Sequence, residues 1–205
     1  MSAWKAKRFW TAAEAVACDG GFTVRLDGRP VKTPAKAALV VPTQAMAEAI
    51  AVEWDAQTGE VKPATMPVTR AANSAIDKII PQRDEVVEII AAYGQSDLLC
   101  YRALGPAALV ERQAAGWDPV LDWAAKVLGA RLAVTAGVMH VAQPPEALAR
   151  LTARVAGMTE FQLAGFHDLV AISGSLVLAL AVTERRLSED EAWACLLYTS
   201  PSPRD

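Results

Sequence analysis

The sequence predicts an α+β fold, in which a small antiparallel β-rich N-terminal domain (residues 1–42) precedes a larger, mainly α-helical domain (residues 43–194). Two observations predict it: apolar and polar residues alternate over the first segment, and apolar residues recur at helical spacing over the second. The chain has 205 residues, 53% of them apolar and 21% charged. A chain of this size and composition can bury a core without disulfides or metals.

The N-terminal strands are predicted from alternation and turn residues. Residues 22–26 alternate between apolar and polar side chains, as a half-buried strand does. Asp27 and Gly28 follow. An Asp-Gly pair between two such segments indicates a hairpin, because glycine accepts the positive φ of a type I′ turn. A second turn at residues 19–21 would pair the strand back toward residues 9–10.

The rest of the sheet is predicted from Pro30 and from residues 38–41. Pro30 should lie at an edge or at a strand start, because proline has no N–H to donate to a neighbouring strand. Residues 38–41 predict one more short strand.

The first helix should begin after Thr43, whose hydroxyl can accept a hydrogen bond from a backbone N–H of the first turn. Met46, Ile50 and Trp54 then fall on one face of the helix. This continuous stripe favours a core position for Trp54. Gly59 is expected to end the helix.

Prolines divide the helical region that follows. Residues 60–69 are predicted to be an extended connector. A helix that starts near Arg70 should break at Pro81, because a proline inside a helix removes a hydrogen bond and clashes with the preceding turn. Asp118 and Pro119 predict a new helix start, with aspartate as the cap and proline at the first helical position.

The last third of the chain predicts a hairpin and a long helix. Short β-type segments flank Gly137, which would provide the turn. The Thr159-x-x-Gln162 pattern is a capping box, and it should open an apolar helix that extends to about Val182. The small residues 173–175 within that helix indicate close packing against another helix rather than a nucleophile motif.

Charge and cysteine content argue against several classes of protein. The formal net charge is −3, with 20 Lys and Arg against 23 Asp and Glu, so no nucleic-acid partner is expected. Residues 169–182 are apolar, but 14 residues are fewer than the roughly 18 of a membrane-spanning helix, so no membrane insertion is expected. Three widely spaced cysteines without a C-x-x-C pair indicate a reducing compartment.

The C-terminus changes character abruptly. Residues 195–205 read CLLYTSPSPRD and resemble the translation of a sequencing adapter. We interpret them as an artefact, including Cys195, and leave them out of the fold prediction. Ser188 and Glu191 form a capping box just before this segment, so the helix that they open would be cut short.

Catalytic and cofactor motifs are not found. The sequence has no phosphate-binding loop, no dinucleotide-binding glycine pattern and no paired metal-ligand spacing. His140 and His167 are its only histidines. We therefore expect no enzyme, catalytic residue, cofactor, metal or small-molecule substrate. A small cytoplasmic hydrolase that uses Cys100 or a serine with a histidine stays open as an alternative.

Tryptophans beside carboxylates are the remaining candidates for function. The chain has six tryptophans, and Trp54, Trp117 and Trp123 each adjoin an acidic residue. One interpretation is a core residue with a polar flank. The other is a partner-binding surface, because tryptophan anchors many protein interfaces.

A series of motifs in a fixed order gives a more specific indication. In order they read KRFW at 7–10, GGFTVRLDGRPVKTPAK at 20–36, VPT at 41–43, EWDAQ at 53–57, MPVTRAANSAID at 66–77, DLLCYRA at 97–103, WDPVLDWA at 117–124 and GSLVLALAV at 174–182. Over residues 7–194 the chain resembles the assembly chaperones of the ATP synthase catalytic head that bind the alpha subunit (ATP12-type chaperones). The N-terminal motifs and EWDAQ carry most of this resemblance.

The resemblance implies a protein that binds unassembled alpha subunit and prevents its aggregation until beta subunit replaces it. It also implies a non-enzyme and a β-rich domain followed by a helical one. No transit peptide is seen, so the chain looks like a bacterial, cytoplasmic member of a family that is mitochondrial in eukaryotes. A general holdase stays open as an alternative. Positions inside the matching motifs are the candidate partner-binding residues: Trp54, Asp55, Arg70, Asp97, Trp117, Asp118 and Trp123.

Overall fold

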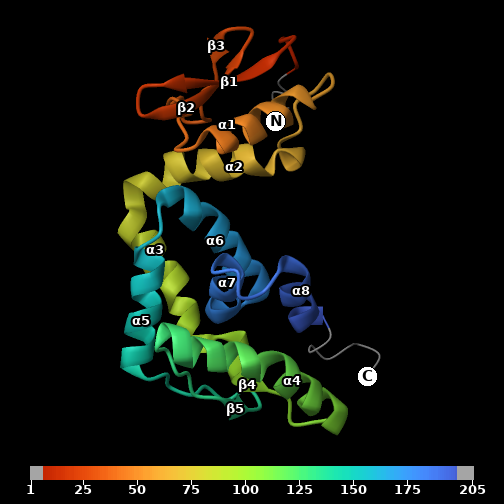
Figure 1. The fold of residues 1–205 in the computed structure, drawn as a ribbon, viewed down its shortest axis with the longest axis vertical. Helices are drawn as coiled ribbons and strands as arrows, with labels where there is room; N and C mark the ends of the chain where they lie inside the picture. The colour runs from red at the N-terminus through yellow and green to blue at the C-terminus, as the bar shows by residue number, and fades with distance from the viewer. Residues whose placement is uncertain (1–6, 198–205) are drawn as a thin grey trace, which may run out of the picture. The chain divides into compact units, whose positions relative to one another are not determined.

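The computed structural model describes residues 7–197 and confirms the α+β class. The chain forms two compact units, Met1–Arg83 and Asp84–Asp205 (Figure 1). The sequence predicted a division after residue 42, whereas the first unit also contains two helices. A small sheet needs a packed layer on one face to be stable, and the helix that follows the sheet supplies that layer.

The sheet of the first unit has three antiparallel strands in the order β1-β2-β3: β1 is Ala13–Cys18, β2 is Gly21–Leu26 and β3 is Arg29–Pro30. The predicted hairpin joins β2 to β3. Asp27 and Gly28 have φ of 45° and 81°, the two positive values that a type I′ turn requires. Pro30 lies on the edge strand, as its missing N–H demands.

Two details of the predicted sheet are wrong. The strand that pairs with β2 is Ala13–Cys18 and not residues 9–10, because the turn at Asp19 and Gly20 sets Cys18 directly opposite Gly21. Residues 38–41 make no regular strand. They form only isolated bridges, in which Val41 pairs with Phe22 and Ala38 with Lys32.

Gly21 is a position where only glycine fits. Its φ is 148°, and a Cβ added there would lie 2.5 Å from the carbonyl oxygen of Val41. We expect Gly21→Ala to lower the free energy of unfolding by about 1–3 kcal/mol from backbone strain, with the clash adding to it. Gly28→Ala is the matched control, because Gly28 also has a positive φ but no atom within 4 Å of an added Cβ. Urea unfolding of both variants measures the loss of free energy of unfolding. An equal loss in the two variants would show that the clash with the Val41 carbonyl contributes nothing.

Two helices complete the first unit. Helix α1 is Gln44–Asp55, and the Thr43 hydroxyl accepts a hydrogen bond from the Met46 N–H at 3.3 Å, as predicted. The helix ends before Gly59, at Asp55, and its buried face packs on β1 and β2.

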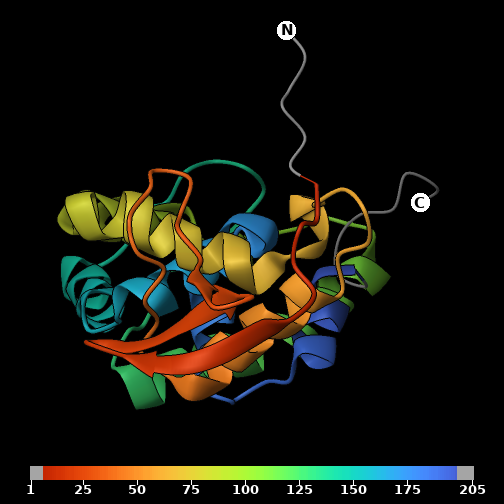
Figure 2. The same cartoon turned by 90° about the horizontal axis from the view of Figure 1, so that it is seen from above.

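Helix α2 is Pro67–Ser74 and begins three residues earlier than predicted, after a short 3₁₀ turn at Pro63–Thr65. Within this unit α1 lies between the sheet and α2, and Figure 2 shows the strands crossing in front of α1.

Pro81 does not break the helix, contrary to the prediction. A π-helical segment, Ala75–Ile79, follows α2, and a 3₁₀ turn, Ile80–Gln82, leads into α3, Arg83–Ala92. The Ile80 N–H reaches the Ala75 carbonyl in the wider π turn. The changed hydrogen-bond spacing accommodates the proline and keeps the backbone helical.

The second unit is mainly helical. Its elements after α3 are the 3₁₀ turns Tyr93–Ser96 and Leu98–Cys100, strand β4 at Tyr101–Arg102, α4 at Ala107–Trp123, the π-helical segment Ala124–Leu128, β5 at Thr135–Ala136, α5 at Pro145–Ala156, α6 at Glu160–Ser173, α7 at Leu176–Thr183 and α8 at Glu189–Leu197. Helix α7 is the centre of the core, because six consecutive residues of it are buried. Within the residues that are described, no helix has both the length and the apolar character needed to cross a bilayer.

Three local predictions for this unit are wrong. Pro119 lies inside α4 instead of starting a new helix. The segments around Gly137 do not form a hairpin, because β5 pairs in parallel with β4. The capping box of Thr159 and Gln162 is present as predicted, but the apolar helix is interrupted at Gly174, so α6 and α7 are separate helices.

The interruption at Gly174 coincides with a buried carboxylate from another part of the chain. Asp97 has no exposed surface, and its side chain accepts hydrogen bonds from Ser175 Oγ at 2.7 Å and from the Val177 N–H at 2.9 Å. It also accepts one from the Leu99 N–H at 3.0 Å. Asp97 thereby caps the start of α7 and the turn that contains Leu99.

The described part of the C-terminal segment is helical. Residues 195–197 continue α8, and the carbonyl of Cys195 accepts a hydrogen bond from Trp117 Nε1 at 3.0 Å. Residues 198–205, where most of the adapter-like sequence falls, lie outside the described residues. The interpretation of residues 195–205 as an artefact stays a prediction.

Candidate functional site

The KRFW and EWDAQ motifs meet in space within the first unit. Trp10 and Trp54 pack edge to face, with ring centroids 5.1 Å apart. The Arg8 guanidinium donates hydrogen bonds to the Trp10 and Gln57 carbonyls at 2.9 and 2.8 Å. Asp55 pairs with Arg8 at 3.5 Å and accepts a hydrogen bond from the Ala13 N–H at 3.0 Å. These contacts fasten the segment before β1 to the end of α1.

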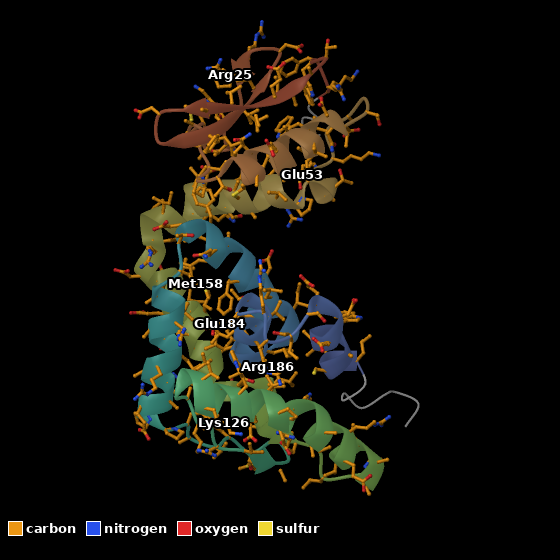
Figure 3. The ribbon with its side chains drawn as sticks, in the orientation of Figure 1. Arg25, Glu53, Lys126, Met158, Glu184 and Arg186 are labelled. Carbon is orange, nitrogen blue, oxygen red and sulfur yellow. The ribbon has the colours of Figure 1, made fainter. Side chains whose placement is uncertain are left out.

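Glu53 has a structural role that the sequence analysis did not find. One of its carboxylate oxygens accepts a hydrogen bond from the Val68 N–H at 2.7 Å, and the other accepts one from the Thr69 N–H at 2.8 Å. Figure 3 labels Glu53 between α1 and α2. A carboxylate at a helix start satisfies N–H groups that have no partner inside the helix and interacts favourably with the helix dipole. EWDAQ is therefore largely a motif that joins α1, α2 and the sheet.

The two tryptophans also line a hollow of about 670 Å³, which we call the aromatic groove. Its apolar lining residues are Phe9, Trp10, Leu26, Pro30, Val31, Trp54 and Val61, and its charged lining residues are Lys7, Arg29 and Lys32. Phe9 is 68% exposed, whereas Trp10 is buried beneath it. Within residues 7–197, the buried indole N–H groups of Trp10 and Trp54 have no hydrogen-bond partner.

Arg102 organises a cluster in the second unit. Its Nη2 donates to Asp118 Oδ1 at 2.6 Å, and its Nε donates to the Leu99 carbonyl at 2.9 Å. The guanidinium carbon lies 5.2 Å from the ring centroid of Trp117. Trp117 is buried, whereas the Asp118 side chain is 59% exposed. The exposed carboxylate thus holds a mostly buried guanidinium over a core indole.

Large apolar side chains are exposed beside this cluster. Leu104, Val138 and Met139 are 83%, 93% and 77% exposed, and we call these three residues the apolar surface. Leu104 and Val138 line a hollow of about 400 Å³ whose lining includes Leu109 and Trp117. The β4–β5 pairing and a hydrogen bond from the Gly137 N–H to the Arg102 carbonyl, at 2.8 Å, bring the two loops together.

Within each unit, the predicted partner-binding residues have different surroundings. Trp54 lines the aromatic groove, Asp55 is engaged with Arg8, and Arg70 is exposed on α2. Asp118 and Trp123 line a hollow of about 520 Å³ along α4. Trp117 belongs to the core.

The structure does not support the prediction that Asp97 contacts a partner. It is completely buried and engaged in capping, so its side chain has no surface to offer to a partner. Its side chain instead accepts a hydrogen bond from the Leu99 N–H and so caps the Leu98–Cys100 turn.

The apolar surface and Arg102 were not among the predicted residues. The available signal was weak: Leu104 and Val138 each adjoin a glycine in a non-periodic segment, and only the β4–β5 pairing brings them together. The residues next to Arg8 and Glu53 in the sequence gave no indication of the long-range contacts that these two side chains make.

The residues proposed for nucleophilic chemistry are engaged elsewhere. Burial, and secondarily the Asp97 carboxylate, raise the pKa of the Cys100 thiol to about 12. Ser173 Oγ donates to the Leu169 carbonyl at 2.7 Å, and His140 Nδ1 lies 3.2 Å from the Tyr101 hydroxyl. In residues 7–197, no group of three His, Cys, Asp or Glu side chains is arranged to hold a metal.

The exposed apolar surface is typical of a protein that binds another protein. Comparison with known proteins identifies the class. The family model described as ATP12 chaperone protein matches residues 7–125. The chain therefore belongs to the ATP12 chaperone family, which confirms the resemblance found in the motifs.

Individual relatives agree with this assignment. The mitochondrial protein atp12 of Schizosaccharomyces pombe is 25% identical over 200 residues, which cover 92% of this chain and 69% of that protein. The crystal structure of Atp12 from Paracoccus denitrificans is 48% identical, with a TM-score of 0.91, and the match covers 94% of this chain and 83% of that one. The Atu1473 protein of Agrobacterium tumefaciens is 47% identical, with a TM-score of 0.90 and coverage of 94% and 72%.

Proposed function

We propose that this chaperone assists assembly of the catalytic head of the proton-transporting ATP synthase. It binds free alpha subunit and prevents its aggregation until beta subunit replaces it. The observation that carries the proposal is the apolar surface of a chain that belongs to the ATP12 chaperone family. Exposed apolar side chains of this size, next to a hollow, favour binding to another protein.

The physical reason for such a role lies in the client. A subunit of a ring-shaped assembly has large surfaces that its neighbours normally cover. When it is alone, those surfaces are exposed and promote aggregation. A chaperone that covers one of them stabilises the free subunit by mass action, and the subunit's permanent partner displaces it by competing for the same surface.

We also propose that the protein is not an enzyme and uses no ATP. A catalytic thiol has to be accessible and readily ionised, whereas Cys100 is buried and its pKa is raised to about 12. These features speak against a hydrolase built on Cys100. The similarity to Paracoccus and Agrobacterium proteins at 47–48% identity supports a bacterial origin, and with it we propose a cytoplasmic location.

The proposal predicts that polar substitutions on the apolar surface weaken client binding without unfolding the chaperone. We expect Leu104→Asp/Val138→Asp to lower the amount of soluble alpha subunit recovered on co-expression at least fivefold, because the contact would require burying two carboxylates. Ile172→Asp is the matched control, because Ile172 is also exposed (72%) and lies on α6 of the same unit. Circular dichroism checks that all variants fold.

Three outcomes would count against the proposal. Client binding would be contradicted if the amount of soluble alpha subunit were the same with the wild-type chaperone, with the Leu104→Asp/Val138→Asp variant and without any chaperone. Equal protection of unrelated aggregating proteins would favour a general holdase. Retention of alpha subunit by the chaperone in excess beta subunit would contradict the replacement step.

A further inference from the structure

The aromatic groove of the first unit combines an apolar lining with charge of a single sign. Among the residues that the structure describes, seven apolar and three cationic ones line it, and no carboxylate does. The whole chain is acidic, with a net charge of −3. A concentration of cations around a hollow therefore departs from the general charge of the molecule and would attract a partner of opposite charge.

The cations are held on the groove side by the sheet. Arg29 pairs with Leu26 across the β2–β3 hairpin, and paired residues project from the same face of a sheet. Leu26 is buried and lines the groove, so Arg29 projects from that same face at the open edge of the sheet. Lys32 follows Val31, and both line the hollow.

The lining also has two features that a folded core would normally avoid. Phe9 packs edge to face against Trp10, with ring centroids 5.2 Å apart, yet most of its surface remains exposed. The indole N–H groups of Trp10 and Trp54 are buried and have no partner in the described part of the chain, whereas native proteins pair nearly all such groups. An exposed aromatic ring in an apolar hollow with a few charged groups at its rim is typical of a binding pocket.

We infer that the aromatic groove binds a short segment of the client protein in which apolar side chains are flanked by carboxylates. The apolar side chains would cover Phe9 and fill the hollow, and the carboxylates would pair with Arg29 and Lys32 at its rim. A volume of about 670 Å³ accommodates a few side chains and not a whole domain surface. The inference rests on the proposed function for the identity of the client.

Charge reversal of Arg29 and Lys32 tests the inference with purified alpha subunit as the probe. We expect Arg29→Glu/Lys32→Glu to raise the Kd at least tenfold and to weaken the salt dependence of binding, because attraction becomes repulsion. Arg25→Glu is the matched control. Arg25 is exposed on β2, next to Leu26 in sequence and therefore on the opposite face of the sheet, and Figure 3 shows it at the sheet. Its reversal should change the Kd less than twofold.

A second probe separates the chemistry of the groove from the identity of the client. We expect the wild-type chain to bind the blocked peptide EELLEE at least tenfold more tightly than KKLLKK, with a change in tryptophan fluorescence because Trp10 and Trp54 line the groove. The double variant should lose this preference. A preference for the acidic peptide without any binding of alpha subunit would support the groove and reject the proposed client.

Several results would overturn the inference. Equal affinity for the two peptides would reject the acidic segment. Unchanged binding of alpha subunit by the double variant, when the wild type does bind, would reject the groove while leaving the proposed function intact. A dimer of the wild-type chain that the double variant abolishes, seen by sedimentation velocity, would identify a second copy as the occupant.

Discussion

Replacing Asp97 with alanine should lower the free energy of unfolding by about 3–5 kcal/mol. The substitution leaves the Leu99 N–H, the Ser175 hydroxyl and the Val177 N–H without their acceptor in a buried site. Each unsatisfied buried donor costs about 1–3 kcal/mol, and release of the carboxylate from burial offsets part of the total. Chemical denaturation followed by circular dichroism measures the loss.

Two further variants define the role of Asp97. Asp97→Asn should cost less than alanine, since one oxygen still accepts, but its NH₂ group must face a backbone donor. Asp168→Ala is the matched control, because the Asp168 side chain is 73% exposed in the same unit. A loss for Asp97→Ala no larger than that for Asp168→Ala would contradict the capping role.

The same carboxylate should make stability depend on pH. Burial raises the pKa of Asp97 above its ordinary value of 3.8, against the opposing effect of its hydrogen bonds, so the folded state holds this proton more tightly than the unfolded state. As pH rises from 3.8 through the folded pKa, the unfolded state releases the proton first, and stability falls. The advantage of the wild type over Asp97→Asn should therefore shrink as pH rises through this window. A constant or growing advantage would contradict the raised pKa.

Replacing Trp117 with alanine should also cost about 3–5 kcal/mol, because it removes a buried indole and leaves a cavity. Trp117 is 2% exposed, contacts the Arg102 guanidinium and donates to the Cys195 carbonyl. Trp193→Ala is the control, because Trp193 is on the same unit but 54% exposed. Thermal and urea unfolding should separate the two variants clearly.

Trp117→Phe separates the packing of the ring from its hydrogen bond. It keeps an aromatic ring and loses the N–H donor, so it should cost less than alanine. If Trp117→Ala were no more destabilising than Trp193→Ala, Trp117 would not be a core residue. In that case its place in the WDPVLDWA motif would have to be explained by partner contact.

Signals that act over a few residues predicted the structure well. Thr43 caps α1, Asp27 and Gly28 form the type I′ turn, and the Thr159–Gln162 capping box opens α6. In each case the side chain or the backbone freedom of one residue satisfies a group at most three residues away. The spacing of apolar residues predicted the α+β class for the same reason, because both alternation and helical periodicity involve residues only a few positions apart.

Signals that needed a distant partner were missed. Gly174 and Ser175 looked like small residues within one helix, but Asp97, almost 80 positions earlier, stabilises a helix start there. The β4–β5 pair joins segments about 34 positions apart and replaces the predicted hairpin. Pro81 is tolerated because a π-helical segment precedes it, which proline rules for ideal helices do not anticipate, whereas Pro119 lies inside the regular helix α4.

The candidate sites show the same division between features that short-range signals predict and features that depend on distant segments. The sequence by itself determined the fold class, the turn between β2 and β3, the caps at Thr43 and Thr159 and the family, since these depend on residue types at short spacing and on motifs in a fixed order. Only the tertiary structure decided that Asp97 and Trp117 are buried, that Arg8 and Glu53 join distant segments, and that Leu104 and Val138 share an exposed surface. Whether a side chain is exposed, and which side chains lie next to it, depends on how the whole chain packs. The neighbours of a residue in the sequence do not specify which distant segment will cover its side chain.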